Sequence, residues 1–411
     1  MKKIIALLMV LAMVVAAVAC TSTPATPDTP ANPDTPANPD TPANPEAAAY
    51  KVAMVTDYGD ITDESFNQAT YEGCKEFCEA NNVEFTYKKP SGDSTAERVS
   101  AVEAAIDEGY NVIIMPGFAF AGTVVEVAPK YPDTKFVALD VSLGDLLKAA
   151  VTAAGQQYDY NPDNWNLADF VNLSNTYCAV YQEELCGYMA GVAAVKLGYK
   201  HLGFLGGMAV PAVIRYGYGF VQGANAAAVE LGIADQVTVE YVYGNQFFGD
   251  ADITAYMDTW YQTKGVEVVF ACGGGIYTSA VEAAMKVNGK IIGLDIDQST
   301  SISTNFGAKD MVVTSAMKGY SATVQATLLD IVAGNWSMYA GRVETLGLVS
   351  DFPWMNFVQL PMETTQWNES FTLDDYFDLV SRMFNGEITV SDEIRYMPAT
   401  AITVNAYGNI K

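Results

Sequence analysis

Histidine and basic residues are scarce in this sequence. The single histidine, His201, follows Lys200 inside a strand pattern, which leaves no histidine-based catalytic triad and no metal site of several histidines. Lysine and arginine number 22 against 48 aspartates and glutamates, so the formal net charge is −26. This charge opposes binding to nucleic acid or to an anionic membrane surface, and we expect no nucleic-acid partner. Solubility is the simplest reason for the acidity.

The only long apolar run lies at the amino terminus. Two lysines precede the run over 4–19, which is typical of a secretory signal peptide at residues 1–19. The segment Ala17–Cys20 resembles a bacterial lipobox, and we expect Cys20 to be lipidated; an ordinary signal peptide cut near Ala19 is the alternative. No other stretch is long and apolar enough to span a bilayer.

A proline-rich repeat follows the first cysteine. Residues 21–46 repeat Thr-Pro-Ala-Asn-Pro-Asp and carry almost no core-forming side chains, so we expect residues 20–49 to form a lipidated, disordered stalk. A lipid anchor with a stalk places the folded part on the extracytoplasmic face of the cell membrane, near partners in that membrane.

The remaining five cysteines do not form an obvious disulfide framework. Their number is odd, and the helical spacing of Cys74 and Cys78 is unfavourable for a disulfide. We expect these cysteines to act as small buried hydrophobes, because a zinc site at this pair would lack ligands. We therefore expect neither a metal nor a cofactor.

From Lys51 onward, short apolar runs alternate with amphipathic helical patterns, which is typical of parallel α/β sheets. Residues 143–175 interrupt this alternation. We interpret them as an insertion that forms a lid or a rim loop. The expected strands are 52–55, 84–88, 111–115, 135–140, 201–208 with its glycine turn, 237–243, 266–271, 291–296, 387–390 and 401–404.

Candidate binding residues follow the ends of these strands. Asp57, Phe66 and Asn67 lie in the loop and helix start after the first strand, and Asp140 ends the fourth. In an open parallel sheet such positions border the ligand crevice. A packing role for Phe66 and a capping role for Asn67 are the structural alternatives. The bare backbone at Gly273, after a later strand, would let a ligand approach closely.

Several motifs resemble the basic membrane protein family of substrate-binding lipoproteins, which includes the purine nucleoside receptors of ABC importers. The first is Asp57-x-Gly59-x-Ile61-x-Asp63-x-Ser65-Phe66-Asn67-Gln68. The others, in the family's order, are Gly187-Tyr188-Met189-Ala190-Gly191, Gly206-Gly207-Met208-x-x-Pro211-x-x-x-Arg215, the turn Gly244–Asp250, Gly293-x-Asp295-x-Asp297-Gln298 and Thr314-Ser315-x-x-Lys318. The turn is one residue longer here than the family's Gly-x-Phe-x-Asp.

The resemblance implies a type I periplasmic-binding-protein fold, with two doubly wound α/β lobes joined by a multi-strand hinge. We expect residues 50–176 and 297–340 in the N-terminal lobe, and 177–296 and 341–411 in the C-terminal lobe. It also implies a monomer that captures a small molecule and passes it to an ABC transporter permease, without catalysing a reaction.

For a purine nucleoside ligand, the resemblance implies three sets of contacts. The base would stack between Phe66 and a second ring, for which we favour Phe247 over Phe248 or Tyr216. The edge of the base would be read by Asp57, Asn67 and Asp140. The ribose would be held by Asp295 and Lys318, for which an exposed helix lysine is the structural alternative.

Three other functions stay open at this point. A receptor of the same fold for a sugar, riboflavin or a signalling molecule would keep the Asp295 carboxylate. A nucleoside-cleaving enzyme would need a metal-binding cluster, for which Asp57, Asp60 and Asp63 are candidates with Glu64. A structural or adhesive lipoprotein would need no cleft chemistry.

Overall fold

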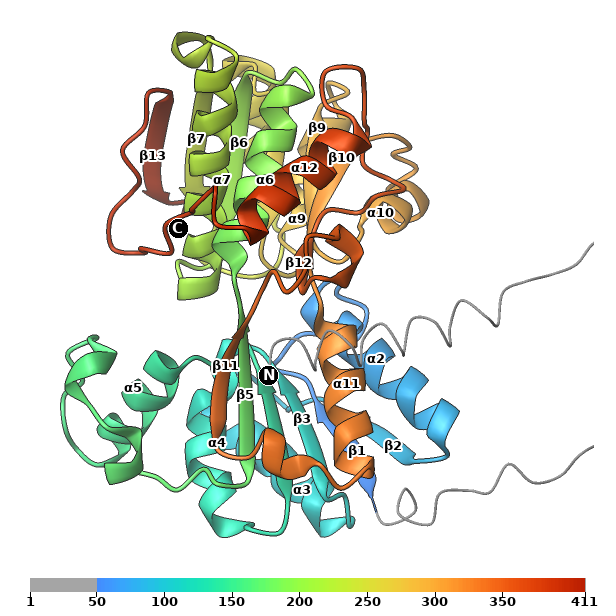
Figure 1. The fold of residues 1–411 in the computed structure, drawn as a ribbon, viewed down its shortest axis with the longest axis vertical. Coiled ribbons are helices and arrows are strands. Elements are labelled where there is room, and N and C mark those ends of the chain that lie inside the picture. Colours follow the sequence, from blue (N-terminus) through green and yellow to red (C-terminus); the bar gives the residue numbers. More distant parts are fainter. Residues whose placement is uncertain (1–49, 411) are drawn as a thin grey trace, which may run out of the picture.

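The computed structural model describes residues 50–410, which form two α/β lobes stacked end to end (Figure 1). The predicted signal peptide, the predicted lipidation of Cys20 and the predicted stalk lie outside the described residues. The two-lobed α/β class is confirmed, because each lobe has its own mostly parallel sheet.

The N-terminal lobe has a six-stranded parallel sheet with the order β11-β5-β4-β3-β1-β2. Its strands are β1 (Lys51–Val55), β2 (Glu84–Lys88), β3 (Val112–Pro116), β4 (Lys135–Leu139), β5 (Thr176–Tyr181) and β11 (Arg342–Leu346). Its helices are α2 (Phe66–Asn81), α3 (Thr95–Asp107), α4 (Ala121–Val127), α5 (Leu143–Ala153) and α11 (Tyr320–Val332).

The C-terminal lobe has a seven-stranded sheet with the order β12-β10-β9-β8-β6-β7-β13, in which β12 alone is antiparallel. Its strands are β6 (His201–Gly206), β7 (Thr238–Tyr243), β8 (Val268–Cys272), β9 (Lys290–Asp295), β10 (Val312–Lys318), β12 (Val358–Gln359) and β13 (Thr403–Asn409). Its α-helices are α6 (Glu183–Lys196), α7 (Pro211–Glu230), α8 (Ala251–Asp258), α9 (Tyr277–Met285), α10 (Ser299–Phe306) and α12 (Leu373–Phe384).

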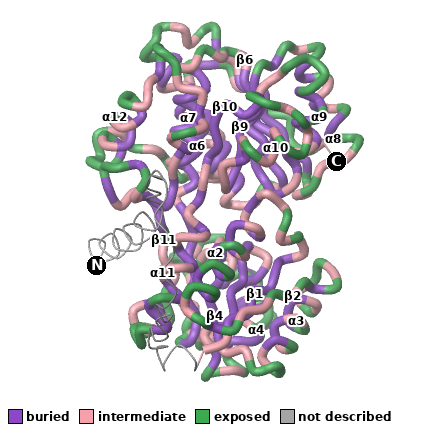
Figure 2. Tube along the Cα trace, turned by 90° about the vertical axis from the view of Figure 1, so that its right-hand side faces the viewer, coloured by how far each residue is buried: buried purple, intermediate pink, exposed green. Residues whose placement is uncertain are grey.

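Helices cover both faces of each sheet, so the central strands are buried on both sides (Figure 2). In β1, Val52 and Met54 pack in the core under α2, whereas Ala53 and Val55 pack in the core under α3 and α4. Successive side chains of a strand point to opposite faces, so a strand between two helical layers must be apolar throughout. This requirement explains the uninterrupted apolar runs of the sequence.

The chain crosses between the lobes three times, after β5, after β10 and after β11 (Figure 1). The predicted lobe division differs from the sheets at these crossings. Strand β5 extends the first sheet to Tyr181, β10 belongs to the second sheet, and β11 returns to the first. The difference arises because membership depends on long-range pairing, such as Ala316 beside Leu294, which local sequence patterns do not encode.

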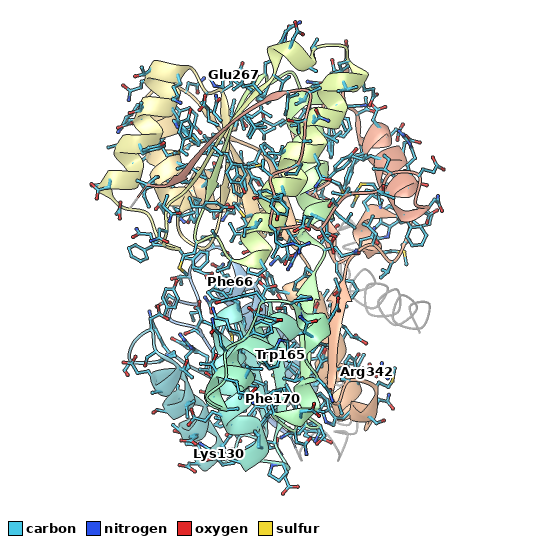
Figure 3. All side chains as sticks on the ribbon, turned by 90° about the vertical axis from the view of Figure 1, so that its left-hand side faces the viewer. Phe66, Lys130, Trp165, Phe170, Glu267 and Arg342 are labelled. Atoms are coloured by element: carbon cyan, nitrogen blue, oxygen red, sulfur yellow. The ribbon has the colours of Figure 1, made fainter. Side chains whose placement is uncertain are left out.

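The insertion at 143–175 contains a helix that the sequence pattern did not predict. Helix α5 begins with a capping box in which the Ser142 and Asp145 side chains each accept from the other's backbone. Around it, Leu147, Val151 and Tyr158 form a small separate core, on which Trp165 and Phe170 pack (Figure 3). The insertion is thus partly helical, and its role as a lid or rim loop stays a prediction.

Two smaller expectations have different outcomes. The strand expected at 387–390 was wrong, because these residues form no ladder, and the last strand runs over Thr403–Asn409. The five cysteines of the described chain are all free and buried, as expected. Within residues 50–410, no helix is both long enough and apolar enough to cross a membrane.

Candidate ligand-binding site

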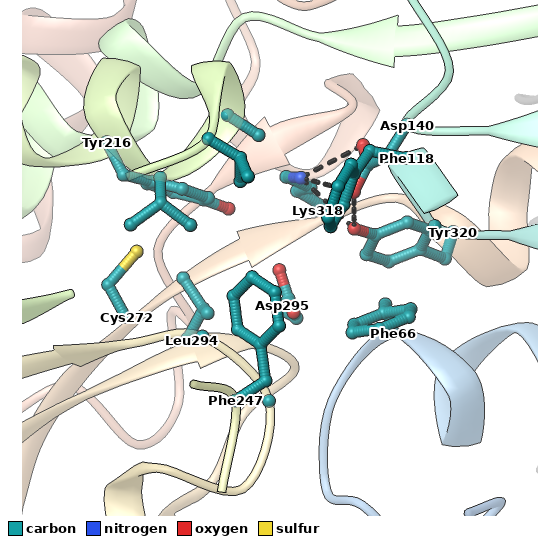
Figure 4. A pocket seen from close by; sticks show the side chains of 16 residues that line it. Phe66, Phe118, Asp140, Tyr216, Phe247, Cys272, Leu294, Asp295, Lys318 and Tyr320 are labelled. Atoms are coloured by element: carbon teal, nitrogen blue, oxygen red, sulfur yellow. Dashed lines mark hydrogen bonds and ion pairs between the residues drawn. The ribbon is translucent and has the colours of Figure 1, made fainter. Parts of the chain in front are cut away.

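A cavity of about 460 Å³, counted with its open mouth, lies between the two lobes. Seven of the predicted site residues line it: Phe66, Asp140, Tyr216, Phe247, Gly273, Asp295 and Lys318 (Figure 4). They come from the carboxyl ends of strands in both sheets and from the segments that follow them.

Aromatic rings from both lobes face this cavity. Phe66 starts α2 in the N-terminal lobe, and its ring centroid lies 6.4 Å from that of Tyr320. Phe247 follows β7 in the C-terminal lobe, and its ring lies 6.2 Å from Phe118 of the opposite lobe. Figure 4 shows Phe66 and Phe247 on either side of the Asp295 carboxylate. Phe248 is 55% exposed and does not line the cavity.

Two glycines fix the position of the Phe247 ring. A Cβ atom at Gly207 would lie 2.4 Å from Phe247 Cδ1, and one at Gly273 would lie 2.8 Å from the same atom. Gly273 also has a φ of 141°, which side chains rarely adopt. The glycine-rich turn after β8 is therefore needed for the ring to pack against the cavity wall.

Asp57 and Asn67 lie behind Phe66 and do not line the cavity. Asn67 Nδ2 donates to Asp57 Oδ1 over 3.0 Å and to Asp63 Oδ2 over 3.0 Å. Asn67 Oδ1 is buried without a hydrogen-bond partner, and burial raises the pKa of Asp57. A Cβ at the wall residue Gly117 would lie 3.3 Å from Phe66 and 3.6 Å from Asp57 Oδ2, so Asp57 lies next to a residue of the cavity wall.

Asp295 ends β9 and is contacted from the other lobe. Ser65 Oγ donates to Asp295 Oδ2 over 2.5 Å. Burial raises the pKa of Asp295 to about 7, although Lys318 and the Ser65 hydrogen bond act in the opposite direction. Asp295 also has a φ of 64°, a left-handed backbone conformation that is uncommon outside glycine. A buried carboxylate held in this way is suited to accept hydrogen bonds from ligand hydroxyls.

Lys318 is the centre of a buried ionic cluster. Its Nζ lies 3.0 Å and 2.9 Å from the two Asp140 oxygens and 3.0 Å from Glu183 Oε1. Tyr320 also donates to Asp140, over 2.5 Å. The Lys318 side chain is only 3% exposed at the end of β10, which is inconsistent with an exposed helix lysine. Burial lowers its pKa, but Asp140 and Glu183 together raise it well above the ordinary value.

Asp140 therefore lies with Lys318 and not with Asp57 and Asn67, with which the sequence analysis had grouped it. Its φ of 60° turns the chain at the end of β4. Asp140 belongs to the N-terminal lobe and Lys318 to the C-terminal sheet, so this ion pair joins the lobes. The pairing depends on how the lobes face each other, which no local motif encodes.

The sequence analysis missed two side chains that line the cavity, Phe118 and Tyr320, and two that form the ionic cluster beside it, Glu183 and Arg215. Phe118 follows the glycine at the end of β3, and Arg215 lies within one of the family motifs. Both residues could therefore have been identified from the sequence. No local sequence pattern identifies Glu183. Its role is evident only from its ion pairs with Arg215 and Lys318, between which it is buried at the start of α6.

The acidic loop does not form a metal site. Asp60 pairs with Lys89 at the surface over 2.9 Å, while Asp63 accepts hydrogen bonds from the backbone of Ser65 and Gln68. Among residues 50–410, no group of three or more His, Cys, Asp or Glu side chains is arranged to hold a metal ion. The cavity combines rings, a carboxylate and an ion pair, which are groups that can bind and orient a polar molecule.

Comparisons with known proteins identify the family. The family model described as ABC transporter substrate-binding protein PnrA-like matches residues 50–393. The ABC transporter nucleoside-binding protein BmpA of Lactococcus lactis is 25% identical over 261 residues, which are 60% of this chain and 64% of that protein. This alignment spans less than two thirds of that relative. Basic membrane protein A2 of Borrelia garinii is 26% identical over 345 residues, 83% of this chain and 88% of that protein.

A solved structure supports the fold. The crystal structure of an ABC transporter solute-binding protein from Aeropyrum pernix is similar with a TM-score of 0.60 and 20% sequence identity, over 84% of this chain and 94% of that one. The expected periplasmic-binding-protein fold is thereby confirmed. Because the family model covers well over half of the chain, this protein belongs to the PnrA-like substrate-binding proteins of ABC transporters, which bind a solute and are not enzymes.

Proposed function

We propose that this substrate-binding protein takes up a purine nucleoside in the cleft between its lobes. The observation that carries the proposal is that Phe66 and Phe247, from opposite lobes, line the same cavity as the buried carboxylate of Asp295. A nucleoside offers a flat base for the rings and a vicinal diol for the carboxylate. Stacking contributes about 1–3 kcal/mol per base. The name of the Lactococcus lactis relative agrees with this choice.

The roles of the other residues follow from their neighbours. Asp57 and Asn67 would read the edge of the base, as the resemblance implies, once closure of the lobes exposes them to the cavity, and the unpaired Oδ1 of Asn67 would then serve as an acceptor. Asp295 and Lys318 would hold the ribose. The contacts of Asp140 favour a place beside Lys318 at the ribose over its expected place at the base. Closure of the lobes would complete these contacts without breaking any bond.

The proposal includes a membrane location and a partner. Lipidation of Cys20 would anchor the chain on the extracytoplasmic face, and the segment at 20–49 would serve as the tether. A monomer on such a tether would meet the ABC transporter permease in the same membrane. The test is metabolic labelling with a fatty acid, in which Cys20→Ala should lose the label and leave the membrane fraction.

Calorimetry tests the ligand. The mature chain, unfolded and refolded to remove any carried-over ligand, is titrated with adenosine, guanosine, inosine, cytidine, ribose and riboflavin. We expect one-to-one binding of a purine nucleoside that is weakened by Phe66→Ala and by Asp295→Ala. Binding of ribose or riboflavin alone would replace the nucleoside by another ligand of the same fold. Release of free base from inosine would contradict a receptor without catalysis.

A further inference from the structure

The cleft contains cationic groups that commonly bind phosphate. Helix α7 starts at its edge, where Val210 provides no side-chain cap for the free backbone N–H groups. Arg215 lies one turn further along α7, and Lys318 lies across the cavity. A helix amino terminus with an arginine and a lysine favours a dianionic phosphate.

A second cavity extends from the proposed ribose position toward these groups. It has a volume of about 250 Å³ with its mouth, and it shares Phe118, Asp140, Val210 and Ala212 with the main cavity. Its other wall includes Ser142, Asp145 and Arg215. The second cavity therefore adjoins the main one and is bordered by the Arg215 guanidinium.

Glu183 occupies the position between the two cations. Its Oε2 lies 2.6 Å from Arg215 Nε and its Oε1 lies 3.0 Å from Lys318 Nζ, and its side chain is 0% exposed. Burial raises the pKa of Glu183, but Arg215 and Lys318 more than offset this effect and hold the pKa below its ordinary value. The carboxylate is therefore charged and neutralises the cations that a phosphate would otherwise contact.

The other acids of the region strengthen this balance. Asp140 takes the remaining side of Lys318, and Asp145 borders the second cavity. Arg215 and Lys318 thus share this region with three carboxylates, those of Glu183, Asp140 and Asp145, and Asp295 is a fourth acidic group nearby. A phosphate monoester carries a charge of about −1.5 to −2 at neutral pH, so it would enter a region in which the carboxylates outnumber the cations.

We propose that Glu183 is a specificity-determining residue that makes the cleft reject phosphorylated nucleosides and accept uncharged ones. This inference rests on the proposed function, because it concerns which form of the nucleoside binds. Glu183 acts by pairing with both cations, and removal of its charge would leave Arg215 without an ion pair and Lys318 with Asp140 alone, so that a 5′-phosphate could take the place of the carboxylate.

The test compares two neighbouring glutamates in the full mature chain. Glu183→Gln removes the charge between the cations, and Glu184→Gln is the matched control, because Glu184 is also buried at the start of α6 but forms no ion pair with either cation. Calorimetry measures the affinity for a purine nucleoside and for its 5′-monophosphate. We expect the preference for the nucleoside to fall about tenfold or more in Glu183→Gln and to stay unchanged in Glu184→Gln. Added salt should weaken the gained phosphate binding.

The outcomes separate this inference from the proposed function. Absence of nucleoside binding by the wild type would contradict the proposed function itself. Wild-type binding with an unchanged preference in folded Glu183→Gln, or equal wild-type affinity for nucleoside and monophosphate, would overturn only the role of Glu183. If the variant does not fold, the wild type is titrated with a nucleoside bearing an uncharged 5′-methylthio group. Rejection of this group as strongly as of phosphate would show exclusion by size and overturn the inference.

Discussion

Ser65 and Asp295 are 230 residues apart, yet the Ser65 hydroxyl donates to the Asp295 carboxylate over 2.5 Å, from one lobe to the other. Ser65 precedes helix α2 in the loop after β1, and Asp295 is the last residue of β9. Both residues therefore lie at the carboxyl ends of strands, which border the cleft. The contact therefore joins the lobes at the cavity wall. Loss of a proton from the Asp295 carboxyl group should therefore change the free energy of unfolding of the protein.

We expect stability to fall as the pH rises through the range between the two pKa values of Asp295. Its folded pKa is about 7, raised by burial from an ordinary value of 3.8. The folded state therefore retains a proton that the unfolded state has released, and this contribution is lost as the pH approaches 7. Urea denaturation at pH 5, 6, 7 and 8 measures the decline. Asp295→Asn should remove part of it, and equal slopes in both proteins would contradict the assignment.

Lys318→Met should destabilise the protein strongly. The substitution leaves the Asp140 and Glu183 carboxylates buried without the ammonium group, and breaking a buried ion pair in this way costs about 3–5 kcal/mol. The control is Lys286→Met, which removes a surface pair with Asp258 and should cost at most about 1 kcal/mol. Urea denaturation compares the two free energies of unfolding. Similar small losses would mean that the buried cluster contributes little.

Replacement of the cavity rings should weaken ligand binding. Phe66→Ala and Phe247→Ala each remove one stacking face, which corresponds to a loss of about 1–3 kcal/mol, or roughly 5- to 150-fold in affinity. The neighbouring Phe248 is 55% exposed and outside the cavity, so Phe248→Ala should leave the affinity unchanged. Calorimetry with the identified ligand measures all three. A loss in Phe248→Ala equal to that in Phe247→Ala would contradict the choice of ring.

Gly273→Ala should disturb the site through the Phe247 ring. The new Cβ would lie 2.8 Å from Phe247 Cδ1, so the ring must move away from the cavity wall. Gly265→Ala is the control, because Gly265 also has a positive φ, of 75°, but its Cβ would meet no atom within 4 Å. Both variants should lose stability, whereas only Gly273→Ala should lose ligand affinity by about tenfold. Unchanged affinity in Gly273→Ala would show that the ring adapts.

Much of the strand and helix content could be predicted from the sequence, because burial between two helical layers requires continuous apolar runs. Strand β1 and the capping box at Ser94 and Glu97 are examples in which local chemistry agrees with the structure. The helix in the insertion at 143–175 was missed, since the aromatic and polar residues around it concealed its pattern. Its capping residues, Ser142 and Asp145, were the available signal.

The sequence by itself determined which side chains follow the ends of the parallel strands, such as Phe66 and Asp140 in one lobe and Phe247 and Asp295 in the other. Only the tertiary structure decided which of them touch. Lys318 pairs with Asp140 and Glu183, and Asp295 with Ser65, because three chain crossings bring the lobes face to face. Strand ends are encoded by local apolar patterns, whereas ion pairs between lobes depend on distances between segments far apart in the chain.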